Sequence, residues 1–499
     1  MTNRSESKTE FPQATGFAMV PGRIAAWPPA LPSLDGTRPN GAERGGGHEK
    51  GTAARSRVRF WTMVAALAVA STLASTASAA TGNILLVIAD DFGLDMASFY
   101  PRPARIESAP PAPRLPNLGQ LARQGVTFND AWATPWCSPT RATILTGRYG
   151  FRTGIGRPKT SGLPELAQAE VTLPEVIRAQ APQYVLAHVG KWHLSSGLRD
   201  PNRQGWAHYA GPEPRLGRIN DYGRWTKVVD GTATTSTTYA TTDTVDETLG
   251  VIEEARRADR PYFVWTAFNA PHTPFHKPPN ALHSRDYLPA SGAPDRSYYE
   301  AMVEALDTEL GRLLRSVDLA TTTVIFVGDN GTPNNVVAAP YERAKAKGTV
   351  YQGGVGVPLL VAGRGVSGGN REARVLVNTT DLFPTILELA GIDPGSALPR
   401  GVKTDGVSLA PYLANRVHPS PRRWAFAEEF TSSYRTEWER TVRDRQYALI
   451  ERHDGTREFY NLVADPLQKA DLLERTLTDT ERSRFEALVR QLDRIIASR

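Results

Sequence analysis

The chain has 499 residues, 40% of them hydrophobic, which is enough to bury one large core and a smaller second one. Its formal charge of +6 is concentrated near the start, where residues 1–79 hold nine Lys and Arg against five Asp and Glu. The rest of the chain therefore carries 49 basic against 47 acidic residues, a net of +2. This balance argues against a protein that binds nucleic acid through bulk electrostatics.

An apolar segment follows a cluster of three arginines early in the chain. It covers Trp61–Leu73 and runs into Ala77-Ser78-Ala79, a small-residue sequence suited to signal peptidase. We therefore expect a signal peptide over residues 55–80 and a periplasmic or secreted protein that meets the membrane only through this export signal. A retained anchor is the alternative, but a span needs about 20 apolar residues. Residues 1–54 are either a disordered extension or lie before the true translation start.

Four short apolar runs each end in polar groups. They are Asn83–Ala89 before Asp90-Asp91, Tyr184–Val189 before Gly190–His193, Tyr262–Ala267 before Asn269–His272, and Thr323–Val327 before Gly328–Asn330. Helical patterns lie between them, at Leu115–Gln124, Leu173–Arg178, Val245–Arg257 and Tyr298–Ser316. This alternation predicts an α/β fold with a large, mostly parallel sheet sandwiched by helices. Ligands bind beyond the carboxyl ends of such strands, although Asp, Asn, Gly and Pro also end strands simply as turn formers.

The pattern changes near residue 400. Asp381–Gly391 is typical of a helix closed by glycine, and a loop rich in turn residues follows it. Beyond the loop we expect a small antiparallel sheet and one helix packed on it: strands at Arg423–Glu428, Arg445–Glu451 and Glu458–Leu462, a hairpin turn at His453–Thr456, and the helix at Thr480–Ser498. We therefore divide the mature chain into a catalytic α/β domain, residues 81–400, and a smaller C-terminal α+β subdomain, residues 401–499.

Hard oxygen ligands follow two of the predicted strands. Asp90 and Asp91 come after one strand, and Asp329 and Asn330 come after another. Three carboxylates at one site repel one another unless a cation neutralises them. Ligands that are all oxygen favour calcium or magnesium over zinc. One Asp-Asp pair is weak evidence for a metal site, and the second pair gives it weight.

Cys137 is the only cysteine of the chain, so it cannot form an internal disulfide. Without further context, an inert buried thiol is the simplest interpretation of a lone cysteine. Its neighbours argue otherwise, because Cys137-Ser138-Pro139-Thr140-Arg141 is followed by Leu145-Thr146-Gly147-Arg148. This stretch resembles the signature of the sulfatase family, a Cys-x-Pro-x-Arg pentapeptide followed by a Thr-Gly-Arg element.

Further matches to the sulfatase family follow in the same order over most of residues 83–470. They are Asp90–Gly93, Gly190–His193, Ala270–His272, Gly328–Gly331, Lys347–Thr349 before Tyr351–Gly354, and Asp381–Gly391. The chain departs from the family at two places. Gln352-Gly353-Gly354 stands where Glu-Gly-Gly is frequent, and Gly356-Val357-Pro358 stands where Arg-Val-Pro is frequent. Both departures leave Lys347 in place.

The resemblance implies a chemistry for residue 137. In this family a maturation enzyme recognises the pentapeptide and oxidises its cysteine to Cα-formylglycine. We expect this oxidation to happen before folding. One calcium ion is then bound by Asp90, Asp91, Asp329, Asn330 and the formylglycine derived from Cys137. One hydroxyl of the hydrated aldehyde is expected to attack sulfur, and His193 to deprotonate the other hydroxyl so that sulfate leaves.

The resemblance also assigns roles to the basic groups. Arg141, Lys191 and Lys347 are expected to surround the sulfate oxygens, and His272, together with Lys347, to protonate the leaving alcohol or phenol. The plainer alternatives are surface solvation for Arg141 and Lys191 and a turn histidine for His272.

The sequence thus predicts an arylsulfatase-like sulfuric ester hydrolase of the alkaline phosphatase superfamily. Its substrate would be a small-molecule or carbohydrate sulfate ester. A phosphonate or phosphate ester hydrolase of the same superfamily is one alternative. A protein that binds sulfated glycans with Cys137 unconverted is the other.

The segment Ser195–Tyr239 shows no family pattern. It is rich in arginine and aromatic residues: Arg203, Trp206, His208, Arg215, Arg218, Tyr222, Arg224 and Trp225. Such side chains suit an anionic sugar or an aryl ring at the rim of a site, and they equally suit a solvated flap.

Overall fold

The computed structural model describes residues 82–100, 113–158, 163–414, 420, 422–431 and 437–499. The expected extension and signal peptide, residues 1–80, lie outside this part of the chain. Within it, no helix combines the length and the apolar character needed to cross a membrane.

The larger sheet has ten strands in the order β10-β2-β9-β8-β1-β7-β3-β4-β5-β6. In chain order they are β1 (Asn83–Ala89), β2 (Gly125–Trp132), β3 (Val185–Gly190), β4 (His208–Pro212), β5 (Trp225–Val229), β6 (Thr232–Ser236), β7 (Tyr262–Ala267), β8 (Thr322–Gly328), β9 (Leu359–Gly363) and β10 (Arg371–Asn378). The run from β8 to β4 is parallel, as is the pair β10-β2. Strand β9 is antiparallel to both of its neighbours, and β5 and β6 add an antiparallel edge.

Helices cover both faces of this sheet, and β1 shows why. Its alternate residues belong to two separate cores, Ile84, Leu86 and Ile88 to one and Leu85, Val87 and Ala89 to the other. The first core includes residues of α3 (Cys137–Thr146), α5 (Leu173–Gln180) and α10 (Leu382–Leu389), and the second includes residues of α2 (Pro116–Arg123), α7 (Ala240–Arg257) and α8 (Asp295–Arg315). Shorter helices are α4 (Gly150–Thr153), α6 (Asp200–Arg203), α9 (Gln352–Val355), α11 (Pro394–Ala397) and α12 (Ala410–Leu413). A strand buried on both faces needs apolar residues throughout, which β1 has.

The predicted α/β architecture is confirmed. The strands expected at Asn83–Ala89 and Tyr262–Ala267 have those bounds, and the four helices expected between strands form within a few residues of their predicted ends. The threonine-rich stretch after β5 forms the edge strand β6, and α7 begins shortly after it at Ala240. Strands β2, β4, β5, β9 and β10 were not predicted.

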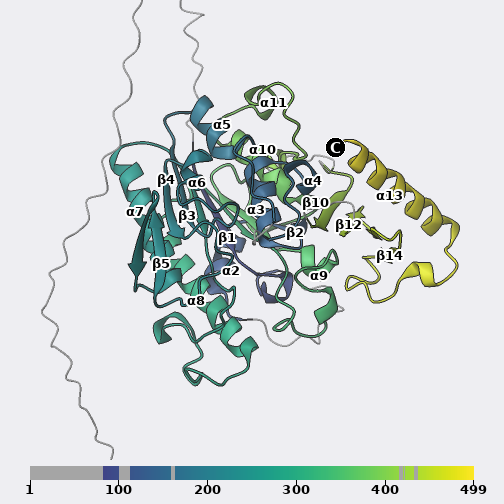
Figure 1. Cartoon of the computed structure of the whole chain (residues 1–499), viewed down its shortest axis with the longest axis horizontal. Helices are drawn as coiled ribbons and strands as arrows, with labels where there is room; N and C mark the ends of the chain where they lie inside the picture. The colour runs from purple at the N-terminus through teal and green to yellow at the C-terminus, as the bar shows by residue number, and fades with distance from the viewer. Residues whose placement is uncertain (1–81, 101–112, 159–162, 415–419, 421, 432–436) are drawn as a thin grey trace, which may run out of the picture. The chain divides into compact units, whose positions relative to one another are not determined.

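The smaller sheet is an antiparallel meander of four strands beside a long C-terminal helix (Figure 1). The elements are β11 (Ala425–Phe430), β12 (Trp438–Arg443), β13 (Tyr447–Arg452), β14 (Arg457–Asn461) and α13 (Asp479–Ala497). A capping box formed by Thr478 and Glu481 starts α13, and its apolar stripe, including Leu488 and Leu492, packs into the core of this sheet. The predicted helix and hairpin are confirmed, whereas β12 was not predicted.

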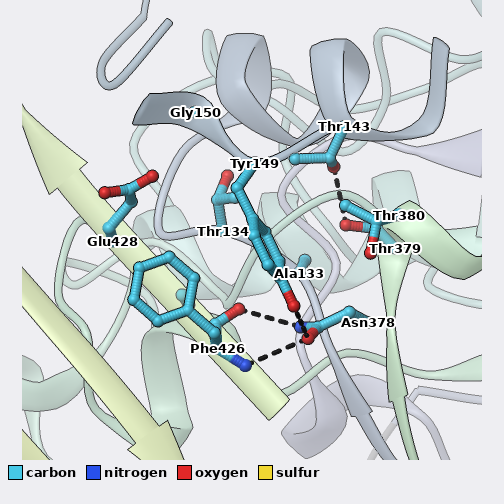
Figure 2. A pocket seen from close by; sticks show the side chains of 11 residues that line it. Ala133, Thr134, Thr143, Tyr149, Gly150, Asn378, Thr379, Thr380, Phe426 and Glu428 are labelled. Carbon is cyan, nitrogen blue, oxygen red and sulfur yellow. Dashed lines mark hydrogen bonds between the residues drawn. The ribbon is translucent and has the colours of Figure 1, made fainter. Parts of the chain in front are cut away.

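Asn378, the last residue of β10, joins the two sheets by imitating a strand partner. Its Nδ2 donates to the carbonyl of Phe426 in β11 at 2.9 Å, and its Oδ1 accepts from the Phe426 N–H at 3.0 Å. The Tyr149 hydroxyl also donates to Oδ1, at 3.1 Å. Figure 2 shows these bonds at the small cavity that the three residues line. One buried amide therefore satisfies both main-chain groups of Phe426.

We predict that Asn378→Ala lowers the free energy of unfolding by about 1–3 kcal/mol, because it leaves the buried N–H and C=O of Phe426 without partners. Urea unfolding followed by tryptophan fluorescence measures this change. Asn335→Ala is the matched control, since the Asn335 side chain is exposed and bonds only to Asp295 among the residues that the structure describes. It should change stability by less than about 0.5 kcal/mol. Equal stability of the two variants would show that the connection between the two sheets does not depend on Asn378.

Candidate active site

Cys137 is the first residue of α3 and is only 2% exposed. Trp136 before it is extended, so the helix begins at the cysteine itself. The first turn of a helix presents unpaired N–H groups and a partial positive charge, which favours an anion at this position. Residue 137 therefore lies where a negatively charged group is stabilised.

Four oxygen-bearing residues meet Cys137 at the carboxyl edge of the sheet. Strands β1 and β8 pair in parallel, so Asp90 and Asp91 after β1 lie beside Asp329 and Asn330 after β8. All four side chains are almost completely buried. One ligand atom each from Asp90, Cys137 and Asp329 lies within 4.8 Å of the other two. The structure thus brings together all five residues that the sequence nominates as metal ligands.

Two residues at this edge have an unusual backbone. Asp91 has a φ of 68° and His193 a φ of 58°, both in the left-handed region that non-glycine residues seldom adopt. Surrounding bonds hold Asp91 there: its N–H donates to Asp329 Oδ1 at 2.9 Å, and its carbonyl accepts from the Tyr299 hydroxyl at 2.7 Å. Such conformations persist only where the surroundings enforce them, and they cluster at functional sites.

Three cationic side chains are packed among the acids. Arg141 donates to Asp329 Oδ2 at 3.0 Å and to the Lys191 carbonyl at 2.6 Å. Lys191 forms an ion pair with Asp90, and Lys347 forms one with Asp91. The plainer expectation that Arg141 and Lys191 are solvated surface residues is wrong, because they are 1% and 0% exposed. Buried charges of this kind are tolerated because each has a partner.

The pKa directions follow from burial and from these pairs. Burial opposes ionisation of Asp91, but Lys347, His272 and Lys191 outweigh it and hold the pKa of Asp91 below its ordinary value. Burial and then the charge of Asp90 raise the pKa of Asp329. Burial also raises the pKa of the Cys137 thiol. The cysteine itself is therefore poorly suited to act as a thiolate nucleophile.

Two oxygen atoms, rather than the total charge, point to a metal ion. The charges of the three carboxylates are balanced by three cations, so the site is neutral without a metal ion. The sequence argument that repulsion between the carboxylates requires a bound cation was therefore incomplete. However, Asp90 Oδ1 and Asn330 Oδ1 are buried with no hydrogen-bond partner in the part of the chain that the structure describes. Buried acceptors rarely remain unsatisfied. An ion that accepts hard oxygen ligands, such as calcium, fits this set of donors.

His193 lies directly against residue 137. Its Nδ1 is 3.3 Å from Cys137 Sγ, and its carbonyl accepts from the Ser138 hydroxyl at 2.7 Å. On the other side, its N–H donates to the Pro214 carbonyl at 3.1 Å. Gly217 packs so closely on the imidazole that an added Cβ would lie 2.7 Å from Cε1 and 2.8 Å from Nε2. The orientation of this ring therefore depends on the absence of a side chain at position 217.

His272 also lies against the acids, with Nε2 3.7 Å from Asp91 Oδ2. Burial outweighs the charge of Asp91 and lowers the pKa of His272 to about 3. Nδ1 lies 2.9 Å from the Thr273 carbonyl, which can only accept, so Nδ1 is the donor in this bond. Nε2 is the ring nitrogen that faces Asp91.

Sequence reasoning missed a wall of the site that involves the smaller sheet. Trp136 is partly exposed, its indole N–H donates to Glu429 of β11, and Lys347 Nζ lies 5.8 Å from its ring centroid. The position of Trp136 next to the cysteine motif was a usable signal. The position of Glu429 was not, because nearly 300 residues separate it from the motif in the sequence.

Comparison with known proteins gives consistent matches. The family model described as Sulfatase matches residues 82–392. N-acetylgalactosamine-6-sulfatase of Sus scrofa is 28% identical over 389 residues, which cover 71% of this chain and 70% of the relative. Arylsulfatase A of Bos taurus is 30% identical over 424 residues, which cover 75% and 74%. The crystal structure of Ps i-CgsB in complex with k-i-k-neocarrahexaose superposes with a TM-score of 0.70 at 22% identity, covering 83% of this chain and 92% of that one, and so shares its fold.

We predict that calcium raises the melting temperature of metal-free protein, because an ion that binds only the folded state stabilises it by about 2.7 kcal/mol at a hundredfold excess over Kd. Differential scanning fluorimetry with and without calcium measures the shift. Asp90→Asn should abolish the shift, whereas Asp318→Asn, at an exposed carboxylate, should preserve it. A shift that survives in Asp90→Asn would place the ion elsewhere.

Proposed function

The chain belongs to the sulfatase family, and from that premise we propose that it hydrolyses a sulfate monoester to an alcohol or phenol and inorganic sulfate. One observation carries the proposal. Residue 137, at the N-terminus of α3, lies against His193 in the same buried cluster as Arg141, Lys191 and Lys347. A nucleophile position beside a base and among cations is the arrangement that transfer of an anionic group requires.

We further propose that Cys137 is converted to Cα-formylglycine by a maturation enzyme. The hydrated aldehyde supplies a hydroxyl nucleophile where the thiol stands. Conversion would precede folding, because the side chain of residue 137 is 2% exposed in the folded protein, although its neighbour Trp136 is partly exposed. A buried side chain is out of reach of another enzyme. The raised pKa of the thiol supports the need for a different nucleophile.

The chain's own cations would bind the sulfate group. Arg141, Lys191 and Lys347 offer N–H donors, and Cys137 and Ser138 at the start of α3 add their main-chain N–H groups. Negative charge spreads over the sulfate oxygens as the ester bond breaks, and donors that are already fixed in place stabilise it without reorganisation. A calcium ion held by Asp90, Asp91, Asp329 and Asn330 would supply additional positive charge beside residue 137.

Proton movement divides between the two sides of the site. His193 Nδ1, 3.3 Å from Sγ of residue 137, is placed to take a proton from a hydroxyl at that position. At the leaving group, His272 and Lys347, which both lie against Asp91, would protonate the departing alcohol or phenol. Burial opposes protonation of Lys347, but Asp91 outweighs it and raises the pKa of Lys347. The Lys347 ammonium therefore stays charged beside Asp91.

The names of the two relatives indicate two kinds of substrate. One names a sulfated sugar and the other an aryl sulfate, so we propose a carbohydrate or aryl sulfate ester as substrate, acted on in the periplasm or outside the cell. Phosphonate or phosphate ester hydrolysis is the competing activity. Comparing kcat/KM on 4-nitrophenyl sulfate and 4-nitrophenyl phosphate decides between them, and preference for the phosphate would overturn the proposal.

We predict that Cys137→Ala abolishes turnover of 4-nitrophenyl sulfate but changes the melting temperature little, because only one small side chain is lost beside polar groups. Kinetics and thermal unfolding of the same preparation measure both effects. Mass spectrometry of the peptide that contains residue 137, from protein made in its native host, should show the aldehyde. An intact thiol in active protein would contradict this account.

We predict that Gly217→Ala lowers kcat about 10- to 100-fold, because a methyl group there displaces the His193 imidazole and misplacement by about 1 Å costs up to about a hundredfold. Steady-state kinetics on 4-nitrophenyl sulfate measures the change. Gly250→Ala is the control, since an added Cβ at Gly250 in α7 meets nothing within 4 Å. Unchanged kcat in Gly217→Ala would mean that His193 is not the base.

A further inference from the structure

The segment between β4 and β5, residues 213–224, forms one side of the active site, and we call it the rim loop. It is anchored at three points. The Pro214 carbonyl accepts from the His193 N–H, Gly217 packs on the His193 ring, and the Tyr222 hydroxyl donates to the carbonyls of Asn269 and His272, at 2.8 Å each. The loop therefore contacts both histidines of the site and is fixed relative to them.

The structure explains most of the arginine and aromatic residues noted in Ser195–Tyr239. The aromatic ones are buried or bonded: Trp206 is 1% exposed, Tyr222 2% and Trp225 7%, and His208 bonds to Asp230 and Glu247. Arg203 pairs with Asp200, and Arg215 pairs with Glu213 at 2.8 Å. The aromatic residues therefore maintain the fold, and Arg203 and Arg215 each have an acidic partner at the surface.

Two exposed arginines remain, Arg218 and Arg224. Neither side chain has an ion pair or hydrogen bond with any residue that the structure describes. Arg218 lies between Gly217, which touches the His193 ring, and Ile219, which is 2% exposed in the core. Arg224 lies beyond the last anchor, next to β5. Only Arg218 is therefore fixed on both sides beside the catalytic histidine.

We propose that Arg218 is a specificity-determining residue that binds a second anionic group of the substrate. The inference rests on the proposed function and deepens it: the substrate class is a saccharide that carries another sulfate or a carboxylate besides the sulfate that is removed. The buried cations Arg141, Lys191 and Lys347 serve the scissile sulfate, and their charges are already balanced by Asp329, Asp90 and Asp91. The guanidinium of Arg218 has no such partner among the described residues, and its planar donors match either oxyanion.

Competitive inhibition of 4-nitrophenyl sulfate hydrolysis tests this inference. Turnover of 4-nitrophenyl sulfate, which is monoanionic, tests the proposed function by itself, so the two can fail separately. The probes are N-acetylgalactosamine 6-sulfate, its 4,6-disulfate, and the disaccharide that links the 6-sulfate to glucuronic acid. The wild type should bind at least one of the dianionic probes about tenfold or more tightly than the monosulfate, as one charge-assisted bond implies. The probe that gains identifies the anion as a sulfate or a carboxylate.

Arg218→Ala should remove this gain and leave kcat/KM for 4-nitrophenyl sulfate unchanged. Arg218→Lys should restore part of it, since the charge returns without the planar donors. Arg224→Ala is the matched control: it removes the same charge from the same loop, beyond the anchored stretch. Equal affinity of the wild type for all three probes would overturn the proposal, and so would an equal loss in Arg224→Ala.

Discussion

The structure depends on the parallel pairing of β1 with β8, which places three carboxylates at one buried edge of the sheet. Carboxylates cannot be buried together without compensation. Arg141 comes from α3, Lys191 from the end of β3 and Lys347 from a loop after β8, and each meets one of the acids. These contacts fix the position of residue 137, because Arg141 and Cys137 lie one turn apart on the same helix.

The surrounding structure supports this cluster at some cost in conformational energy. Asp91 and His193 keep left-handed backbones, and Gly217 approaches the His193 ring more closely than any side chain would allow. The smaller sheet contributes as well. Asn378 binds β11 to the larger sheet. Near the end of the same strand, Glu429 accepts a hydrogen bond from the indole of Trp136. The smaller sheet is thus part of the site's wall, and it is fixed to the larger sheet through hydrogen bonds rather than apolar contact alone.

The strands that are buried on both faces could be predicted from the sequence. Strands β1 and β7 are continuous apolar runs because helices cover both of their faces, and such runs are recognisable. Strands β5 and β12 are partly exposed and β6 is mostly exposed. All three carry threonine, lysine or arginine, so their composition resembles that of loops. Strand β9 has only five residues, and its antiparallel direction depends on neighbours that are distant in the chain. The residues proposed for the site could be nominated from the sequence because short motifs contain them. Gly217 and Glu429 belong to no such motif, and only tertiary contact reveals their proximity.

Diffraction from a crystal grown with calcium, with anomalous differences collected at a long wavelength, tests the central claim most directly. The account predicts one peak among the carboxylates that follow β1 and β8, about 2.3–2.6 Å from their oxygens and in reach of residue 137. The two unpartnered oxygens, on Asp90 and Asn330, should both point at that peak. A fully occupied ion at some other place, with this edge held only by the lysines and the arginine, would contradict it.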